Sequence, residues 1–458
     1  MASITACVDD ELSINKDGAV FMNTSKSRRR VAAAASMAML ATTALAGCGG
    51  DSGGGTPTLT WYINPDVGNS DASKGGQATL AANCTKASGG KYKIKVELLP
   101  NSASDQRTQL LRRLAAGDSS MDLMSTDPAF VTEFAAAGYL APVPESMQKN
   151  FTEDRVQSSI DASMYKGKLT SVPFWANTQL LWYKKSVAQK VGLDMSKPVT
   201  WDQVIDAAKK TKTNVGVQGK LYEGYAVWIN ALVAGGGGKI VEDPSATYEN
   251  IKLGLDSDAG KKAASIINKV ATSGVGGPAI GSSDETASLT LFQSPSGGFL
   301  VNWPYSYGAI QKAAPKVAED VAAAVYPRTD ASHDAAPPFG GIQLAVGKNS
   351  KHTDLAYQAA ECITNEKNTT AYMVASGNPS SRKASYDSAD VKKAFPNGIA
   401  AQIRTSLDKA VPRPLSPYWG DISGALQQQF SPPSKVTPNT PAEAQKFILD
   451  VLKGKALL

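Results

Sequence analysis

The sequence predicts an α/β protein with more than one lobe, on three observations. Strand-like and helix-like segments alternate after residue 58, which favours a largely parallel sheet covered by helices. The 458 residues are too many for one hydrophobic core, so two or three domains or one larger two-lobed body are expected. Hydrophobic residues make up 42% and charged residues 19%, a balance typical of a globular chain rather than a disordered one.

The first α/β unit is predicted from five consecutive segments. They are a strand at 59–63, a helix at 76–87, a strand at 91–98, a helix at 104–116 and a strand at 121–125. The first helix carries Leu80 and Cys84 on one face, and the second ends at Gly117. In the second strand the apolar side chains alternate with charged ones, which predicts one buried face. That face comprises Tyr92, Ile94, Val96 and Leu98.

The rest of the chain continues the alternation. Further strands are predicted at 180–183, 298–302 and 341–346, and further helices at 200–210, 225–233, from 353 and from 440. Thr200 and Gln203 have the spacing of a capping box, as do Thr440 and Glu443, with Pro441 between them. Thr353 is expected to cap the helix that follows it.

The N-terminal segment has the features of an export signal. A basic cluster at 26–30 precedes an uncharged run at 31–47, which is too short for a transmembrane helix. The run ends in Leu-Ala-Gly before Cys48, which resembles a bacterial lipobox. Residues 1–47 are therefore predicted to be a signal peptide, Cys48 a lipidated anchor on the extracellular face of the membrane, and 48–57 a flexible tether. The alternative is an ordinary signal peptide with an incidental cysteine.

Residues 1–21 precede the basic cluster and contain Asp9, Asp10 and Glu11, which suit no export signal. The natural start is therefore expected at Met22, with residues 1–21 not translated. Cleavage would leave Cys84 and Cys362 as a pair in an oxidising compartment, which favours a disulfide over two buried free thiols.

Several function classes are disfavoured. The net charge of +6 is spread along the chain, so nucleic acid is not an expected partner. His333 and His352 are the only histidines, which argues against a histidine-based zinc site and a Ser-His-Asp triad. The sequence holds no GxSxG, P-loop, HExxH or CxxC motif. No catalytic residue, metal or cofactor is predicted.

Aromatic residues instead gather beside amides and single charges near predicted strand ends. These clusters are 174–178, 223–228, 302–305 and 413–419, together with Asp127–Pro128 after the third strand. Sugars need this mixture, because their C–H faces lie on aromatic rings while their hydroxyls pair with carboxylates, amides and guanidinium groups. Ligands of α/β proteins bind at the carboxyl ends of strands, so these clusters predict a sugar site.

Segments along nearly the whole mature chain resemble the extracellular sugar-binding proteins of ABC importers, and within them the trehalose-binding branch of mycobacteria. Beside the lipobox, the matching segments are 127–140, 177–183, 302–305, 340–346 and 413–414. The resemblance implies a periplasmic-binding-protein-like fold of type II, with the sugar held between two lobes. The first lobe would comprise 58–174 and 326–367, and the second 175–325 and 368–458. Cys84 and Cys362 then fall in one lobe.

The resemblance also implies the ligand contacts. They are Asp127, Asn177, Glu223, Trp228, Asn302, Trp303, Gly341 and Arg413, with Gln106, Asn64 and Tyr418 as weaker candidates. The carboxylates would accept sugar hydroxyls, the guanidinium and amides would donate, the indoles would stack, and the glycine would let backbone approach the sugar. Phe174–Trp175 departs from the smaller polar residues of the mycobacterial relatives, and an extra ring could change the sugar preferred.

Structural roles compete with some of these assignments. Asp127 could cap a helix ahead of Pro128, Glu223 could be a solvated loop charge, and Arg413 could form an inter-lobe salt bridge. Three other tryptophans are expected in the core: Trp61, Trp182 and Trp201.

The leading hypothesis is a monomeric binding protein that captures an α-linked disaccharide, trehalose or maltose-like, and delivers it to the transmembrane subunits of an ABC permease. Small oligosaccharides are further candidate ligands. One alternative is a lipoprotein glycoside hydrolase with Asp127 and Glu223 as its carboxylate pair. Another is a peptide- or amino-acid-binding lipoprotein.

Overall fold

The computed structural model describes residues 55–458. The predicted signal peptide, the lipidation site Cys48 and nearly all of the tether lie outside the described residues. Within 55–458, no helix combines the length and apolar character that crossing a bilayer requires.

A five-stranded sheet has the order β2-β1-β3-β11-β6. Its strands are β1 (Thr58–Ile63), β2 (Lys93–Leu98), β3 (Leu123–Thr126), β6 (Val172–Thr178) and β11 (Phe339–Ala345). Strand β1 runs parallel to β2 and β3, whereas β11 is antiparallel to both β3 and β6. The largely parallel sheet expected from the sequence is thus confirmed only for β1–β3. Strand β6 leads out to the other sheet and β11 leads back, so these two must run in opposite directions.

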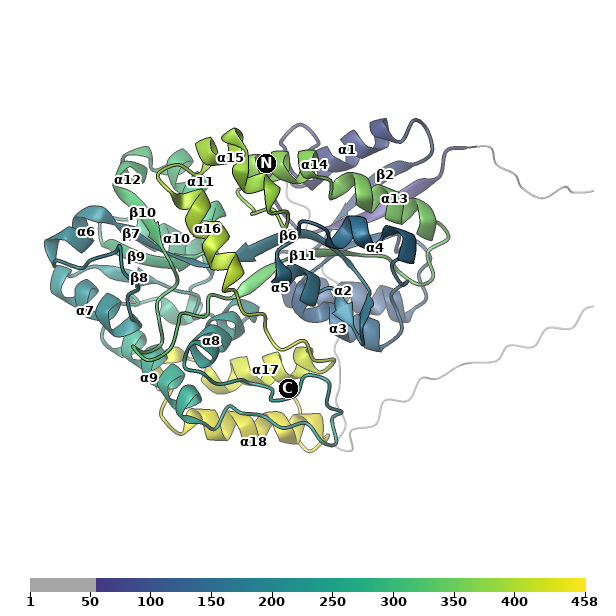
Figure 1. The fold of residues 1–458 in the computed structure, drawn as a ribbon. Helices are drawn as coiled ribbons and strands as arrows, with labels where there is room; N and C mark the ends of the chain where they lie inside the picture. Colours follow the sequence, from purple (N-terminus) through teal and green to yellow (C-terminus); the bar gives the residue numbers. More distant parts are fainter. Residues whose placement is uncertain (1–54) are drawn as a thin grey trace, which may run out of the picture. The chain divides into compact units, whose positions relative to one another are not determined.

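A four-stranded sheet has the order β10-β7-β9-β8. Its strands are β7 (Leu180–Lys184), β8 (Asn214–Gly216), β9 (Gly297–Asn302) and β10 (Val321–Ala324). Strands β11 and β6 end the order of the five-stranded sheet, and Figure 1 shows them on its side toward the four-stranded sheet. We call the five-stranded sheet with its helices the first lobe and the four-stranded sheet with its helices the second lobe. Two short strands, β4 (Met164–Tyr165) and β5 (Lys168–Leu169), pair with each other as a separate antiparallel ribbon.

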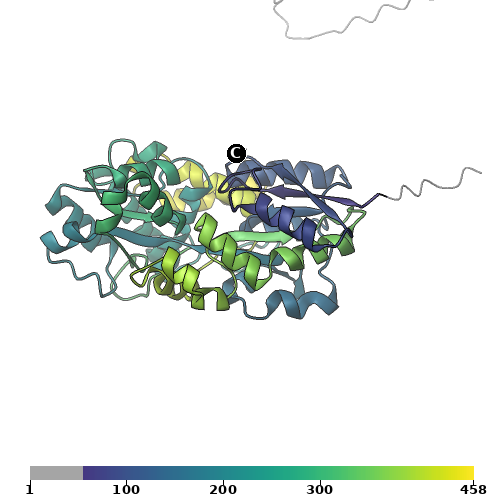
Figure 2. The ribbon, with the colours of Figure 1, turned by 90° about the horizontal axis from the view of Figure 1, so that it is seen from above.

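The first lobe's helices are α1 (Gln77–Ala87), α2 (Ala103–Ala115), α3 (Pro128–Ala136), α4 (Glu145–Thr152), α5 (Gln157–Asp161), α13 (Thr353–Ile363) and α14 (Glu366–Ser376). The later helices are α6 (Lys185–Lys190), α7 (Trp201–Thr211), α8 (Glu223–Gly235), α9 (Asp258–Thr272), α10 (Glu285–Gln293), α11 (Tyr305–Ala313), α12 (Pro315–Asp320), α15 (Ala389–Ala394), α16 (Ile399–Asp408), α17 (Trp419–Phe430) and α18 (Thr440–Leu452). Short 3₁₀ turns occupy 280–282, 384–387 and 433–435. Helix α17 packs against α3 of the first lobe. In Figure 2 the C-terminal helices, in yellow, are drawn between the teal part of the chain and its purple and blue N-terminal part.

The chain changes sheets between Thr178 and Leu180, rather than at the expected 174/175 boundary. Phe174 still packs in a first-lobe core cluster, while Ala176, two residues further on, belongs to a second-lobe cluster. On β11, Ile342 belongs to the first of these clusters and Phe339 to the second. Strands β6 and β11 are therefore shared by both cores. Helix α14 packs on α1 and α13, so the first lobe also extends beyond the expected residue 367.

Local capping follows the sequence in one helix and departs from it in two. Thr200 and Gln203 form the predicted capping box of α7. Helix α18 is preceded by Asn439 instead, because the Thr440 hydroxyl accepts from the Thr437 amide at 2.9 Å in the preceding turn. Helix α13 begins at Thr353 itself, whose hydroxyl donates to the Ser350 carbonyl at 3.3 Å rather than capping the helix.

The alternation predicted for β2 is confirmed except at its end. Tyr92 is buried, and Ile94 and Val96 pack partly buried on the first-lobe core. Leu98 is 45% exposed, contrary to the prediction. The strand ends there, and Leu99 turns into a different core cluster, so the next residue takes the buried position.

A disulfide joins Cys84 of α1 to Cys362 of α13, across 278 residues of sequence. The predicted pairing is therefore confirmed, and both cysteines lie in the first lobe. Trp61, Trp182 and Trp201 are fully buried, as expected for core residues.

Candidate functional site

A cavity of about 930 Å³ lies where residues from both lobes meet. Eight of the eleven residues expected to contact a ligand line it: Asn64, Gln106, Asp127, Asn177, Glu223, Trp303, Gly341 and Arg413. They come from segments that follow β1, β2, β3 and β9, from β6 and β11, from the start of α8, and from the segment before α17. The clusters near predicted strand ends therefore located part of the lining.

Arg413 lies at the junction of the lobes and is only 4% exposed. Its Nη1 donates to Glu223 Oε1 at 2.8 Å and its Nη2 donates to Asp127 Oδ1 at 2.7 Å. Burial alone would lower the pKa of Arg413, but the charges of Asp127 and Glu223 outweigh it and raise that pKa. The guanidinium is thus a charged inter-lobe bridge, which is the structural role that competed with ligand binding in the sequence analysis.

Glu223 is the first residue of α8 and is buried, so it is not a solvated loop charge. Besides Arg413 it accepts hydrogen bonds from Trp419 Nε1 at 2.9 Å and from Ser423 Oγ at 2.5 Å. Both donors belong to α17, so the carboxylate also fixes α17 against α8. A negative charge at a helix N-terminus is further stabilised by the helix dipole.

Asp127 caps α3, which is the structural role that competed with ligand contact, and it also lines the cavity. Its Oδ1 accepts from the Ala129 amide at 2.9 Å, which caps α3, and from Arg413. Its side chain remains 17% exposed and lines the cavity. Because both of these bonds use Oδ1, Oδ2 is the oxygen that can accept from a ligand hydroxyl.

Aromatic rings line the cavity beside these charges, among them Trp175 and Trp303. The Trp303 ring lies over Gly340, where an added Cβ would come within 3.1 Å of Cη2. Phe174 and Trp175 differ in their relation to the cavity. Both rings pack in the first-lobe core, where the Phe174 ring centroid lies 5.2 Å from that of Tyr372, but only Trp175 also lines the cavity.

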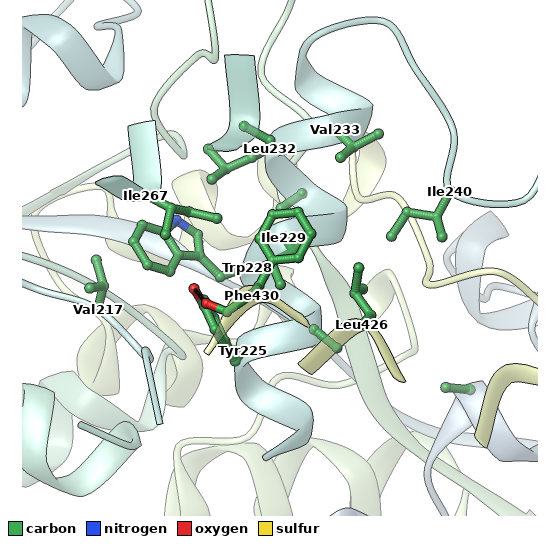
Figure 3. Packing of buried hydrophobic residues seen from close by; sticks show 14 of the residues in the cluster. Val217, Tyr225, Trp228, Ile229, Leu232, Val233, Ile240, Ile267, Leu426 and Phe430 are labelled. Atoms are coloured by element: carbon green, nitrogen blue, oxygen red, sulfur yellow. Dashed lines mark hydrogen bonds between the residues drawn. The ribbon is translucent and has the colours of Figure 1, made fainter. Parts of the chain in front are cut away.

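Three expected contacts do not line the cavity. Trp228 is 1% exposed and packs on Trp201 and Tyr225 in the core (Figure 3). Glu223, Gly224 and Val227 of α8 line the cavity, whereas Trp228 is enclosed by the aromatic core residues around it. Tyr418 packs edge-on against Tyr248.

Asn302 is the third, and it is fully buried. Its Nδ2 donates to the Glu285 carbonyl at 2.9 Å, and its Oδ1 accepts from the Trp303 amide at 2.8 Å. The side chain thus braces residues that line the cavity without lining it.

Gly341 lines the cavity, but the structure gives a different reason why this position requires a glycine. Its φ is +115°, and an added Cβ would lie 2.2 Å from the Trp175 carbonyl oxygen. The neighbouring strand β6, rather than an approaching ligand, leaves no room for a side chain.

Sequence reasoning missed several polar lining residues: Asp66, Lys220, Tyr222, Asp284 and Glu285. Asp66 follows the first predicted strand, so the strand-end rule could have found it. Glu285 begins a helix after a loop, and no local pattern distinguishes it from a surface acid.

Asp66 carries a stability cost that an experiment can detect. Burial raises its pKa from 3.8 to about 6, although hydrogen bonds from Gln77 oppose the rise. The folded state therefore binds a proton more tightly than the unfolded state, and this group weakens folding as the pH rises from below 4 to above 6. We expect Asp66→Asn to increase the free energy of unfolding at pH 7.5 by at most about 3 kcal/mol, measured as a higher melting temperature. Below pH 4 the variant should lose this advantage over the wild type.

The matched control is Asp387→Asn, which removes an exposed carboxylate. Its melting temperature should follow that of the wild type from pH 4 to 8. An Asp66→Asn protein with no pH-dependent difference from the wild type would contradict the burial argument.

Comparisons of the sequence and of the fold find related proteins. A probable ABC transporter-binding protein from Deinococcus radiodurans is 27% identical over 357 residues, covering 74% of this chain and 79% of that protein. The sn-glycerol-3-phosphate-binding periplasmic protein UgpB of Agrobacterium fabrum is 34% identical over 100 residues, or 20% of this chain and 23% of that one. Maltose-bound MalE3 of Thermotoga maritima matches the fold with a TM-score of 0.75 at 20% identity, over 87% of this chain and all of that one.

A second solved structure, the GacH receptor of Streptomyces glaucescens, matches with a TM-score of 0.71 at 21% identity, over 87% of this chain and 98% of that one. The two-lobed α/β fold is therefore that of maltose-binding-protein-like receptors. The profile of the bacterial extracellular solute-binding proteins matches residues 71–370, which is more than half of the chain. The protein is thus a member of the bacterial extracellular solute-binding proteins, a family of binding proteins rather than enzymes.

Proposed function

We propose that this protein is the extracellular solute-binding component of an ABC importer, and that it captures an α-linked disaccharide, trehalose or maltose-like, for delivery to the permease. The observation that carries the proposal is the inter-lobe cavity of about 930 Å³, which places carboxylates, amides and indoles together. This volume is near the upper end of small-ligand sites, which supports a disaccharide or a small oligosaccharide.

The lining matches the two chemical faces of a sugar. Trp175 and Trp303 offer apolar ring surfaces for the C–H face. Asp127 and Asn177 supply an acceptor and a mixed donor–acceptor for hydroxyl groups. Asp127 and Glu223 bind the same guanidinium, so they are not free to act as the separate acid and nucleophile of a glycoside hydrolase.

The relatives support a sugar ligand and an importer partner. The Deinococcus relative is named an ABC transporter-binding protein, and the Thermotoga structure contains maltose. The Leu-Ala-Gly-Cys48 motif adds that the receptor is tethered by lipid to the extracellular face of the membrane, where a monomer can reach the permease.

Capture would proceed by closure of the lobes about β6 and β11, the strands shared by both cores. A sugar that contacts both lobes binds the closed arrangement better than the open one, and this difference drives the closure.

A thermal-shift panel tests the proposal. We expect trehalose or maltose to raise the melting temperature, because a ligand that binds only the folded state adds about 2.7 kcal/mol at 100 times its Kd. The panel should include trehalose, maltose, longer α-glucans, mannitol and dipeptides. Stabilisation by peptides alone, or by none of the sugars, would refute the proposal.

A further inference from the structure

The carboxylate of Glu285 lies in the cavity but outside the Arg413 bridge. Glu285 is the first residue of α10, is half-buried and lines the second-lobe side of the site. Its Oε2 accepts a hydrogen bond from the Tyr222 hydroxyl at 2.7 Å. No salt bridge within residues 55–458 joins it to a cation.

The position of Glu285 is fixed from two sides. The Tyr222 ring folds back over Gly224, where an added Cβ would lie 2.2 Å from the hydroxyl oxygen. Asn302 holds the Glu285 carbonyl and the Trp303 amide with one side chain. Asn302 therefore holds the backbone of Glu285 to that of Trp303, while the Tyr222 hydroxyl holds the carboxylate itself.

A buried chain of amides extends this support. Gln218 Nε2 donates to Ser288 Oγ of α10 at 3.1 Å, and its Oε1 accepts from Gln179 Nε2 at 2.9 Å. Gln179 lies between β6 and β7, where the chain passes from one sheet to the other. The α10 wall of the cavity is thus linked through Gln218 to the segment that connects the lobes.

The charge of Glu285 is incompletely compensated. Burial raises its pKa, the Tyr222 hydrogen bond opposes this, and the nearby Asp284 charge adds to the rise. Five carboxylates line the cavity against three cationic side chains. Lys220 is paired to Asp284 at 3.2 Å, Arg413 is shared by two acids, and Lys312 forms no salt bridge within residues 55–458. Such a site gains from ligand hydroxyl donors and repels an anionic group.

We propose that Glu285 is a specificity-determining residue of the second lobe, which accepts hydroxyl groups of the sugar ring stacked on Trp303 and excludes anionic sugars. This inference rests on the proposed function and deepens it. It divides the cavity into two acceptor positions, Asp127 of the first lobe and Glu285 of the second. The substrate class is then a neutral sugar long enough to engage both.

The test compares one neutral sugar with its phosphate ester. Titration calorimetry would use trehalose or maltose, whichever gives the larger thermal shift, and the corresponding 6-phosphate. We expect the wild type to bind the ester at least about 100-fold more weakly. We expect Glu285→Gln to bind the neutral sugar about 10-fold or more weakly, and to discriminate less against the ester.

Two further variants make the result specific. Tyr222→Phe removes only the hydroxyl that holds the carboxylate, and should weaken neutral-sugar binding severalfold without preventing folding. Glu443→Gln removes an exposed carboxylate from the first turn of α18 and should bind like the wild type.

The outcomes separate the inference from the function on which it rests. If the wild type binds the neutral sugar and Glu285→Gln has the same affinity and the same discrimination against the ester, the role of Glu285 is overturned and the proposed function stands. Unchanged affinity in a folded Tyr222→Phe protein likewise overturns the positioning of the carboxylate. A wild type that binds no neutral sugar overturns both.

Discussion

Replacing Arg413 with methionine is expected to destabilise the protein by about 3–5 kcal/mol and to weaken sugar binding strongly. The side chain is 4% exposed, and it neutralises Asp127 of the first lobe and Glu223 of the second. Without the guanidinium, two carboxylates remain close together and incompletely hydrated, and their repulsion opposes lobe closure. Urea denaturation would measure the stability, and calorimetry with trehalose or maltose the affinity.

Two variants show whether the bridge itself is responsible. Arg112→Met removes an exposed arginine from α2 and should change the stability by less than about 0.5 kcal/mol. Asp127→Ala leaves Arg413 bonded to Glu223, so we expect a smaller stability loss than for Arg413→Met, together with weaker sugar binding. An Arg413→Met protein that matches the wild type in both measurements would show that the two carboxylates need no bridge.

Removal of the Cys84–Cys362 disulfide is expected to have the second large effect, a stability loss of about 2–5 kcal/mol. The bond closes a segment of 278 residues, and restricting so long a loop in the unfolded chain gives a large entropic stabilisation. Neither cysteine lines the cavity, so the Cys84→Ala, Cys362→Ala double variant should keep its sugar affinity within about twofold at temperatures where it is folded.

Thermal unfolding with and without a reducing agent would measure this contribution. The double variant is its own control, since the reducing agent should not change its melting temperature. A wild type whose melting temperature is the same when oxidised and reduced would contradict a stabilising disulfide.

Local patterns were informative wherever a nearby backbone partner or a simple periodicity decides the structure. The Thr200–Gln203 box begins α7 because its two side chains satisfy amides within one turn. The helix that carries Leu80 and Cys84 buries both, since residues four apart share a face. Where capping was predicted wrongly, at Thr353 and Thr440, the hydroxyl bonds to the preceding turn instead.

The same limits apply to the candidate site. The aromatic and polar clusters at strand ends predicted which segments meet, but not which ring of a segment faces the cavity. Trp303 lines the cavity while Trp228 packs in the core, because the orientation of α8 is set by its contacts with α9 and α17. Asn302 had the residue type of a ligand contact, yet its position behind Trp303 makes it a brace.

The sequence by itself determined the α/β class, the order of its main strands and helices, the cysteine pair and some of the segments that line the cavity. These features depend on periodicity, on residue type and on partners close along the chain. Only the tertiary structure decided the crossing of β6 and β11, the Glu285–Tyr222 contact and the Arg413 bridge. Asp127 and Arg413 are 286 residues apart, so whether they pair depends on how two separately packed lobes meet. Side-chain chemistry permits that contact, but only the packing of both cores brings the charged atoms within bonding distance.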